Sequence, residues 1–235
     1  MGAPLYDITI YYNGQVIKDA PDDLDFRRTV NYIADFYHDR LNGYKPPKTG
    51  RICIHLGPSK NWDKPGYFGS ICSYDNVIDE QKYLSLLKME KYKYILNLLH
   101  STVSEIASVY NWEQSIFNEA YNHIIESGFK FEKFYPEKKS KDRKHTGQVV
   151  LTKTEEKSTL STVVISGELV RKEQLLEKTN WYWYDSIYNS AKSCKWFDNT
   201  SFGLYKGEKN CYFSINEDEI ISDLIDDTNN LFGTN

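Results

Sequence analysis

The stretch from Tyr92 to Ser127 constrains the fold most, because its apolar residues recur at helical spacing over two long segments. The two sets are Ile95, Leu98, Leu99, Val103, Ile106 and Val109, and then Trp112, Ile116, Phe117, Ala120, Tyr121 and Ile124. Steps of three and four place each set on one stripe of an α-helix. Asn111 and Gln114 predict a capping box at the start of the second helix, and Gly128 predicts its end. We therefore expect a central pair of long amphipathic helices around which the chain packs.

Before this stretch, the apolar pattern predicts a hairpin, helices and short strands. Residues 6–19 alternate like a half-buried strand, and Asn13-Gly14 is a strong signal of a hairpin turn. A helix is expected from Pro21 to Gly43, with acidic residues at its start, where they complement the helix dipole. Further expected elements are strands over 51–56 and 67–74 and a helix over 79–88.

After Gly128 the pattern changes to mostly strands. We expect strands over 129–134, 148–153 and 159–165, a helix over 181–194, a hairpin over 201–215 and a terminal helix from Asn216, whereas 168–178 fits a helix or a strand. Because helices and strands do not alternate strictly, we expect an α+β fold with mainly antiparallel sheets. The basic segment 138–144 (KKSKDRK) divides a predicted N-terminal half, 1–137, from a β-rich C-terminal half, 138–235, unless both form one continuous domain.

Composition limits the classes of protein to which this chain can belong. Its 235 residues are 40% hydrophobic and 26% charged, which is typical of a folded globular protein. A net charge of −4 disfavours a generally basic nucleic-acid binder. No apolar run reaches the roughly 18 residues of a membrane helix, and the first ten residues lack the features of a signal peptide. We therefore expect a cytoplasmic protein without a membrane segment, whose four cysteines are reduced and buried.

The sequence contains none of the common local catalytic motifs. Phosphate-binding glycine loops, the G-x-S-x-G elbow and H-E-x-x-H are all missing, and no cofactor is expected. His123 shares a helix face with Glu119 and Glu126, but two further metal ligands are not visible. Cys53 and His55 lie on one side of a predicted strand, and Cys72 lies on an expected neighbouring strand, so a Cys–His nucleophilic pair is conceivable.

The features that favour binding are aromatic content and one acidic segment. Aromatic residues reach 15%, with 19 Tyr, and such side chains provide large contact area at low entropy cost. The segment 217–227 has six acidic residues and no basic one, so it can attract a basic partner. The partner-binding residues that we assign are Glu217, Asp223, Asp226 and Asp227, together with Trp181, Tyr182 and Trp183.

Our leading hypothesis is a cytosolic, non-enzymatic protein that binds another protein. Among such proteins, the charge and composition best fit a bacterial immunity protein or antitoxin that blocks the basic active site of a toxic enzyme. One alternative is an enzyme with a cleft between the two halves, in which Cys53, His55 and Trp62 take part. Another is a single-stranded nucleic-acid binder that uses segment 138–144 for phosphates and 181–184 for base stacking.

Overall fold

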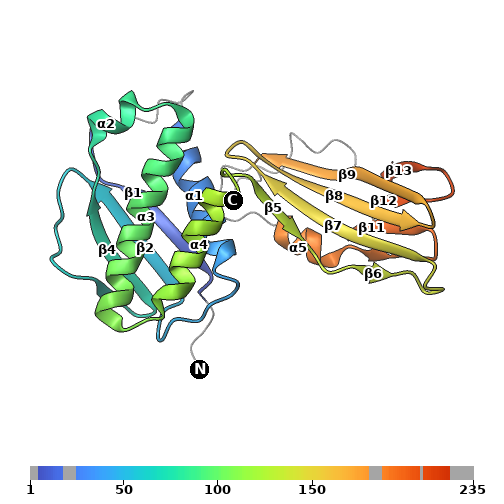
Figure 1. The fold of residues 1–235 in the computed structure, drawn as a ribbon, viewed down its shortest axis with the longest axis horizontal. Coiled ribbons are helices and arrows are strands. Elements are labelled where there is room, and N and C mark those ends of the chain that lie inside the picture. Colours follow the sequence, from blue (N-terminus) through green and yellow to red (C-terminus); the bar gives the residue numbers. More distant parts are fainter. Residues whose placement is uncertain (1–4, 18–24, 180–186, 207–208, 223–235) are drawn as a thin grey trace. The chain divides into compact units, whose positions relative to one another are not determined.

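The chain forms two compact units, which we describe separately (Figure 1). The computed structural model describes residues 5–17, 25–179, 187–206 and 209–222. Unit 1 is Met1–Lys130 and unit 2 is Phe131–Asn235. The division falls before the predicted boundary at residue 137, because strand β5 (Phe131–Phe134) pairs with strand β7 (His145–Lys153) of unit 2. The basic segment 138–144 therefore lies inside unit 2 and does not separate the units.

Unit 1 contains a mixed four-stranded sheet and most of the helices. Its elements are β1 (Asp7–Tyr12), α1 (Asp25–Arg40), β2 (Arg51–Gly57), β3 (Gly66–Phe68), β4 (Ile71–Val77), α2 (Glu80–Ser85), α3 (Lys88–Tyr110) and α4 (Gln114–Glu126). The strand order is β1-β2-β4-β3, in which β1, β2 and β4 are parallel and only β3 is antiparallel. The chain as a whole is α+β with antiparallel-rich sheets, as predicted, but the parallel strands of unit 1 were not expected.

Helices α1 and α3 pack on the same face of the unit 1 sheet. Tyr12, Leu56 and Asn76 are in register across β1, β2 and β4, so their side chains share one face. The Tyr12 ring lies 5.1 Å from that of Phe26 on α1, and the Asn76 side-chain amide donates to the Leu98 carbonyl on α3 at 3.2 Å. Helix α4 packs against both α1 and α3.

The two predicted helices, α3 and α4, exist, but their surroundings differ from the prediction. Four of the expected stripe residues of α3 and three of α4 are buried, namely Ile95, Leu99, Val103, Ile106, Phe117, Ala120 and Ile124. Val109 is exposed, and Ile116 is only partly buried because the neighbouring Phe117 takes the inward position. The pair belongs to the helical layer of unit 1, and unit 2 has a core of its own, so a central role for the pair stays a prediction.

The capping prediction was wrong at the start of α4 and right at its end. Asn111 adopts a left-handed conformation (φ 54°) and donates its backbone N–H to the Ala107 carbonyl, so it ends α3. Helix α4 begins after Glu113 without a side-chain cap. Gly128 has φ 60° and donates to the Ile125 carbonyl, as expected for the residue that ends a helix.

The hairpin predicted over 6–19 does not form in the described part of this segment. Strand β1 pairs in parallel with β2, and the backbone N–H of Asn13 continues this pairing to the Leu56 carbonyl at 2.7 Å. The amides of Gln15 and Val16 donate to the Glu80 carboxylate at 3.2 Å each. Because these amides are already bonded, the chain after Asn13-Gly14 does not return as a second strand.

In its described residues, unit 2 forms two antiparallel sheets and one short helix. Its further elements are β6 (Lys138–Lys139), β8 (Lys157–Ser166), β9 (Leu169–Thr179), α5 (Ile187–Ser193), β10 (Lys195–Trp196), β11 (Ser201–Lys206), β12 (Lys209–Ser214) and β13 (Glu219–Ser222). One sheet has the order β5-β7-β8-β9, with β6 also paired to β7, and the other has the order β10-β11-β12-β13. The sheets contact each other through β8, β9, β11, β12 and β13.

Several sequence predictions in unit 2 were confirmed and one was wrong. Of the helix predicted over 181–194, residues 187–193 form α5, and 181–186 lie outside the described residues. The strands around residues 148–165 and the hairpin over 201–215 are present as β7–β8 and β11–β12. The terminal helix predicted from Asn216 is instead a turn followed by β13, in which Ile220 and Ile221 pair with Phe213 and Tyr212 of β12. The ambiguous segment 168–178 is strand β9, because it pairs along the whole of β8.

The helices of the described residues fall short of a transmembrane span in length or in apolar character.

Candidate functional site

Aromatic side chains lie on the face of the unit 1 sheet that is opposite to α1 and α3. Tyr11 of β1, His55 of β2 and Asp75 of β4 form one register row, which alternates with the helix-facing row. The rings of Tyr11 and His55 are stacked, with centroids 5.2 Å apart and planes 17° apart. The Trp62 ring lies 6.3 Å from His55. Rings from three separate segments thus form one continuous surface.

The loop that carries Trp62 is held at both of its ends. The backbone N–H of Asn61 donates to the buried carboxylate of Asp75 at 2.7 Å. On the other side of Trp62, the Pro65 carbonyl accepts a hydrogen bond from the Tyr110 hydroxyl of α3 at 2.7 Å. Trp62 nevertheless remains 46% exposed. The loop therefore presents a large apolar side chain to solvent from a fixed backbone.

A third attachment joins the same loop to the helical layer. The Lys60 ammonium donates to the Tyr74 hydroxyl at 3.0 Å and pairs with the Glu105 carboxylate of α3 at 3.3 Å. Tyr74 also donates its hydroxyl proton to Glu105. Burial, and next this hydrogen bond to a carboxylate, raise the pKa of Tyr74, so its hydroxyl stays a donor at neutral pH.

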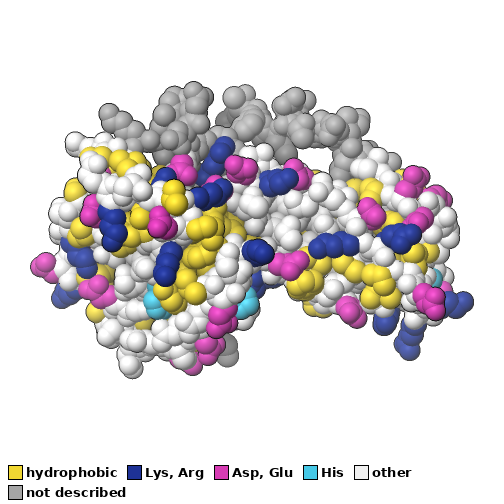
Figure 2. Space-filling model, turned by 45° about the horizontal axis from the view of Figure 1, so that its top comes forward, with side chains coloured by type: hydrophobic (Ala, Val, Ile, Leu, Met, Phe, Trp, Pro, Cys, Tyr) yellow, Lys and Arg dark blue, Asp and Glu magenta, His cyan; other side chains and the backbone are white. Residues whose placement is uncertain are grey.

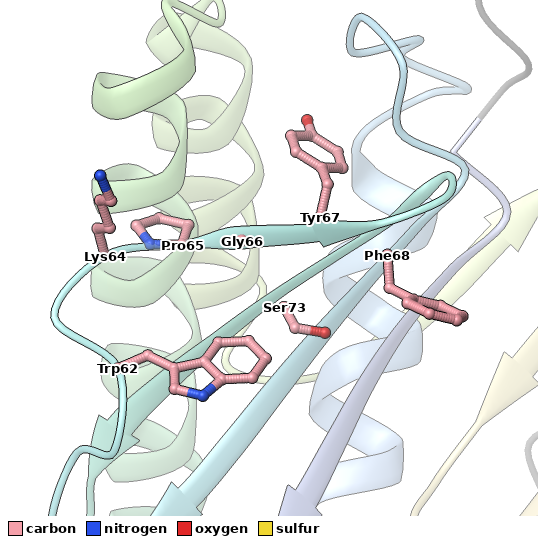
Figure 3. A pocket seen from close by; sticks show the side chains of 7 residues that line it. All are labelled: Trp62, Lys64, Pro65, Gly66, Tyr67, Phe68 and Ser73. Carbon is pink, nitrogen blue, oxygen red and sulfur yellow. The ribbon is translucent and has the colours of Figure 1, made fainter.

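An open hollow of about 350 Å³ lies beside Trp62 at the edge strand β3. Figure 3 shows the Ser73 side chain between the rings of Trp62 and Phe68, while Tyr67 points to the opposite side of the strand. Phe68 is 85% exposed, the highest value among the large hydrophobic side chains described. A Cβ atom at Gly66 would lie 3.9 Å from the Trp62 ring, so this glycine leaves room below the indole. The hollow is lined by Trp62, Lys64, Pro65, Gly66, Tyr67, Phe68 and Ser73.

Cys53 and His55 lie on the same side of β2, as predicted, and the His55 ring contacts those of Tyr11 and Trp62. Cys53 is in register with Ser73, and burial, the largest effect, raises the pKa of the Cys53 thiol. Cys72 lies on the opposite, helix-facing side of the sheet, where burial raises its pKa to about 12. Both thiols are therefore protonated at neutral pH, and Cys72 lies on the other side of the sheet from His55.

The face of α4 that carries His123 was considered for metal binding and set aside for lack of further ligands. In the ranges that the structure describes, three or more His, Cys, Asp or Glu side chains nowhere come together to hold a metal ion. His123, Glu119 and Glu126 are exposed along α4. They are best explained as a solvated helix face.

The basic segment 138–144 forms β6 and the turn that leads into β7. The Lys138 ammonium donates to the Lys192 carbonyl at 3.4 Å, and Lys139 donates to the Thr146 hydroxyl at 2.6 Å. Exposed cations remain at the turn, where an Asp carboxylate lies among them.

On the face seen in Figure 2, Lys and Arg side chains are interspersed with Asp and Glu. This mixture is unlike the continuous basic stripe of a nucleic-acid interface.

The structure locates only one of the partner-binding residues predicted from sequence. Glu217 is exposed in the turn between β12 and β13, not on a helix. Its neighbour Asp218 accepts two hydrogen bonds from the guanidinium of Arg171, at 2.9 and 2.8 Å. The others lie outside the described residues: Asp223, Asp226, Asp227, Trp181, Tyr182 and Trp183.

Sequence reasoning gave Trp62 and His55 as candidates but missed Tyr11 and Phe68. Alternation in the first strand placed Tyr11 away from the apolar side, which was a usable signal. The sequence pattern predicts one strand over 67–74 that includes Phe68, whereas a turn with Gly69 at φ 61° separates β3 from β4. This turn brings Phe68 to the same face as Ser73.

Comparison with known proteins finds no family model, no characterised protein sequence and no solved structure that matches this chain. Function therefore has to be argued from the chemistry of the site itself.

Proposed function

We propose that this protein binds another protein and catalyses no reaction, and that it binds through the aromatic face of unit 1. We define the aromatic face as Tyr11, His55, Trp62 and Phe68. The observation that carries this proposal is the exposure of Trp62 on a loop held by Asp75, Tyr110 and Glu105. Exposed Trp and Tyr side chains that are fixed before binding lose little entropy on association, and such residues dominate the affinity of protein interfaces.

The charges near the aromatic face favour a protein over a nucleic acid as its ligand. Arg51 Nε lies 3.0 Å from the Asp7 carboxylate, and the Lys60 ammonium lies 3.3 Å from Glu105. Each cation is already neutralised by a carboxylate of the same unit. Lys64 remains as a cation beside Trp62. One cation supplies little of the counterion release on which nucleic-acid affinity depends.

The biological role that we favour is that of an immunity protein or antitoxin in the bacterial cytoplasm. In this role, the aromatic face would supply contact energy against a toxic enzyme. The acidic residues Glu217, Asp223, Asp226 and Asp227 would attract its basic active site. Electrostatic attraction acts mainly on the rate of association, whereas buried contacts act mainly on dissociation. The two surfaces therefore make separable contributions.

Binding kinetics with the partner, isolated by affinity capture from the native host, test the aromatic face. Trp62→Ala should weaken binding by about a hundredfold, mostly through faster dissociation. Leu87→Ala is the matched control, because Leu87 is 76% exposed at the start of α3 and away from the aromatic face. Equal dissociation rates for the wild type, Trp62→Ala and Tyr11→Ala would contradict the proposal.

The acidic segment is tested by replacing Asp223, Asp226 and Asp227 with Lys. Association should slow by about tenfold at low ionic strength, and the difference should shrink at high salt. An unchanged association rate would remove this segment from the partner-binding surface. Neutralisation itself is tested by co-expression: cells that produce the partner enzyme should grow with the wild-type protein and fail to grow with Trp62→Ala.

A further inference from the structure

A carboxylate of the chain itself is held by backbone amides and a hydroxyl just after β1. We propose that the loop of residues 13–17 is a binding site for one oxyanion, and that Glu80 occupies it as an internal ligand until an external anion displaces it. Tyr12, which ends β1, points to the helix-facing side of the sheet, whereas Tyr11 belongs to the aromatic face. The inference therefore concerns a second site and does not rest on the proposed protein-binding function.

Among the described residues, three donors converge on one oxygen of the Glu80 side chain. The backbone nitrogens of Gln15 and Val16 each lie 3.2 Å from Oε1, and the Tyr12 hydroxyl donates to the same atom. The hydroxyl in turn accepts the N–H groups of Val16 and Ile17, at 3.1 and 2.8 Å, so its proton is directed at the carboxylate. Successive backbone N–H groups that point at one atom form a concave anion site. The loop is therefore a preorganised set of donors for a negatively charged oxygen.

Gly14 leaves the space that this oxygen takes. A Cβ atom at position 14 would clash with Glu80 Oε1 and would lie 2.5 Å from the Tyr12 hydroxyl. The backbone can approach the carboxylate this closely only because glycine has no side chain. Position 14 therefore admits an oxygen atom where every other residue would place carbon.

The loop lies where parallel sheets commonly bind ligands. Strands β1, β2 and β4 are parallel, so their carboxyl ends share one edge of the sheet. The loop follows the end of β1 at Tyr12, and Glu80 follows the end of β4 at Val77. In open sheets with parallel strands, ligands bind outside the carboxyl ends of the strands. Donors and internal ligand thus meet at the edge of the sheet that is typical of a binding site.

The site favours a negative charge and faces solvent. The hydrogen bond from the Tyr12 hydroxyl, with smaller effects from the loop amides, lowers the pKa of the Glu80 carboxyl. The same donors stabilise any other oxyanion that takes the place of this carboxylate. Gln15 and Val16 are exposed, so an anion reaches their amides from solution. Glu80 is therefore a competitor that an external anion has to displace.

The test is an NMR titration of the full, isotope-labelled chain with sodium phosphate and with sodium acetate, at constant pH and ionic strength. In Glu80→Ala, both anions should cause saturable shifts of the amides of residues 15–17. Binding should be tighter than to the wild type by about tenfold or more, because an internal ligand competes at an effective concentration in at least the millimolar range. The anion that binds more tightly identifies the natural ligand group as a phosphate or a carboxylate.

Three further variants serve as controls. Glu90→Ala removes the same charge from a carboxylate that accepts the Leu87 N–H at 2.8 Å, and it should leave residues 15–17 as unresponsive as in the wild type. Tyr12→Phe, added to Glu80→Ala, should weaken anion binding by about tenfold, because it removes a donor to a charged group. Glu80→Gln keeps an acceptor oxygen that holds the loop in place, and its anion affinity should lie between those of the wild type and Glu80→Ala.

Four results would overturn the inference. The first is the absence of saturable shifts at residues 15–17 in both Glu80→Ala and Glu80→Gln. The second is wild-type binding as tight as that of Glu80→Ala, which would show that Glu80 does not compete. The others are equal anion affinities of Glu90→Ala and Glu80→Ala, and equal affinities with and without the Tyr12 hydroxyl.

Discussion

The two units use their sheets in opposite ways. In unit 2, two antiparallel sheets contact each other, and Gly147 of β7 lies directly against the Phe202 ring of β11. In unit 1, helices cover one face of the sheet, and on the other face the rings of Tyr11, Trp62 and Phe68 remain exposed. Inward positions of unit 2 are fixed by packing, whereas the second face of the unit 1 sheet combines buried positions such as Cys53 and Asp75 with exposed rings. The difference explains why the candidate site lies in unit 1.

The largest expected effect tests whether the helical layer stabilises unit 1. Phe117 is fully buried, with its ring 5.5 Å from Tyr44 and 6.2 Å from Trp112. Phe117→Ala should lower the free energy of unfolding by about 3–5 kcal/mol, because it removes contacts and leaves a cavity. Hydrogen exchange should show the loss of protection in α1, α3 and α4.

The matched control is the adjacent residue Ile116, which is only partly buried. Ile116→Ala should cost clearly less than Phe117→Ala, although sequence periodicity placed both residues on the buried stripe. Equal costs would show that α4 is rotated relative to the arrangement described above. Loss of protection mainly in unit 2 would contradict the assignment of α4 to the core of unit 1.

The second prediction compares the same substitution in a strand of each unit. A Cβ atom at Gly147 would approach the Phe202 ring carbons to 2.5–2.7 Å, whereas at Gly66 it would meet only Trp62 at 3.9 Å. Gly147→Ala should therefore destabilise unit 2 by about 1–3 kcal/mol, the usual cost of overpacking. Gly66→Ala should leave the melting temperature of unit 1 nearly unchanged. If both variants melt like the wild type, unit 2 is less tightly packed than its buried side chains imply.

Local patterns predicted the helices and most strands, but not how the strands pair. The stripe from Ile95 to Ile106 and the helix with Phe26 and Val30 are correct, because helical periodicity is set by neighbours within a few turns. Asn13-Gly14 failed as a hairpin signal, because a partner distant in sequence, β2, pairs with β1 in parallel and Glu80 binds the following amides. Such long-range competition is not visible in a local pattern.

The candidate site was only partly accessible from sequence for the same reason. His55, Cys53 and Trp62 could be proposed together because they lie close in the chain. Tyr11 and Phe68 join them only through strand register and through the turn after β3. The acidic segment was assigned from its composition and from a helix predicted to start at Asn216, and the turn at Glu217 shows that its first residues are not helical.

The third prediction concerns the support of Trp62. The Asp75 carboxylate is buried and accepts the Asn61 amide. Asp75→Ala should destabilise unit 1 by about 1–3 kcal/mol, since it leaves that amide without its acceptor. Asp75→Asn keeps an acceptor oxygen and should cost less. A shift of the Trp62 indole N–H signal toward its random-coil position in the Ala variant would show that the loop has lost its fixed position. Unchanged spectra in both variants would contradict the role of Asp75 in holding the loop.

The smallest effect is a pH dependence that arises in the helical layer of unit 1. The His100 ring nitrogen Nδ1 lies 2.8 Å from the Tyr37 hydroxyl, and burial lowers the pKa of His100 below its ordinary value of 6.5. The folded state binds this proton less tightly than the unfolded state. The stabilisation that neutral His100 gives to the folded state is therefore complete above about pH 6.5, and it is lost as the pH falls toward the lowered pKa. Urea midpoints at pH 7.5 and 5.5 should therefore differ more for the wild type than for His100→Gln. Carboxylates titrate equally in both proteins, so they do not contribute to the difference between them. An identical pH dependence would therefore mean that His100 is protonated in the folded state without cost, and that water reaches it within the helical layer.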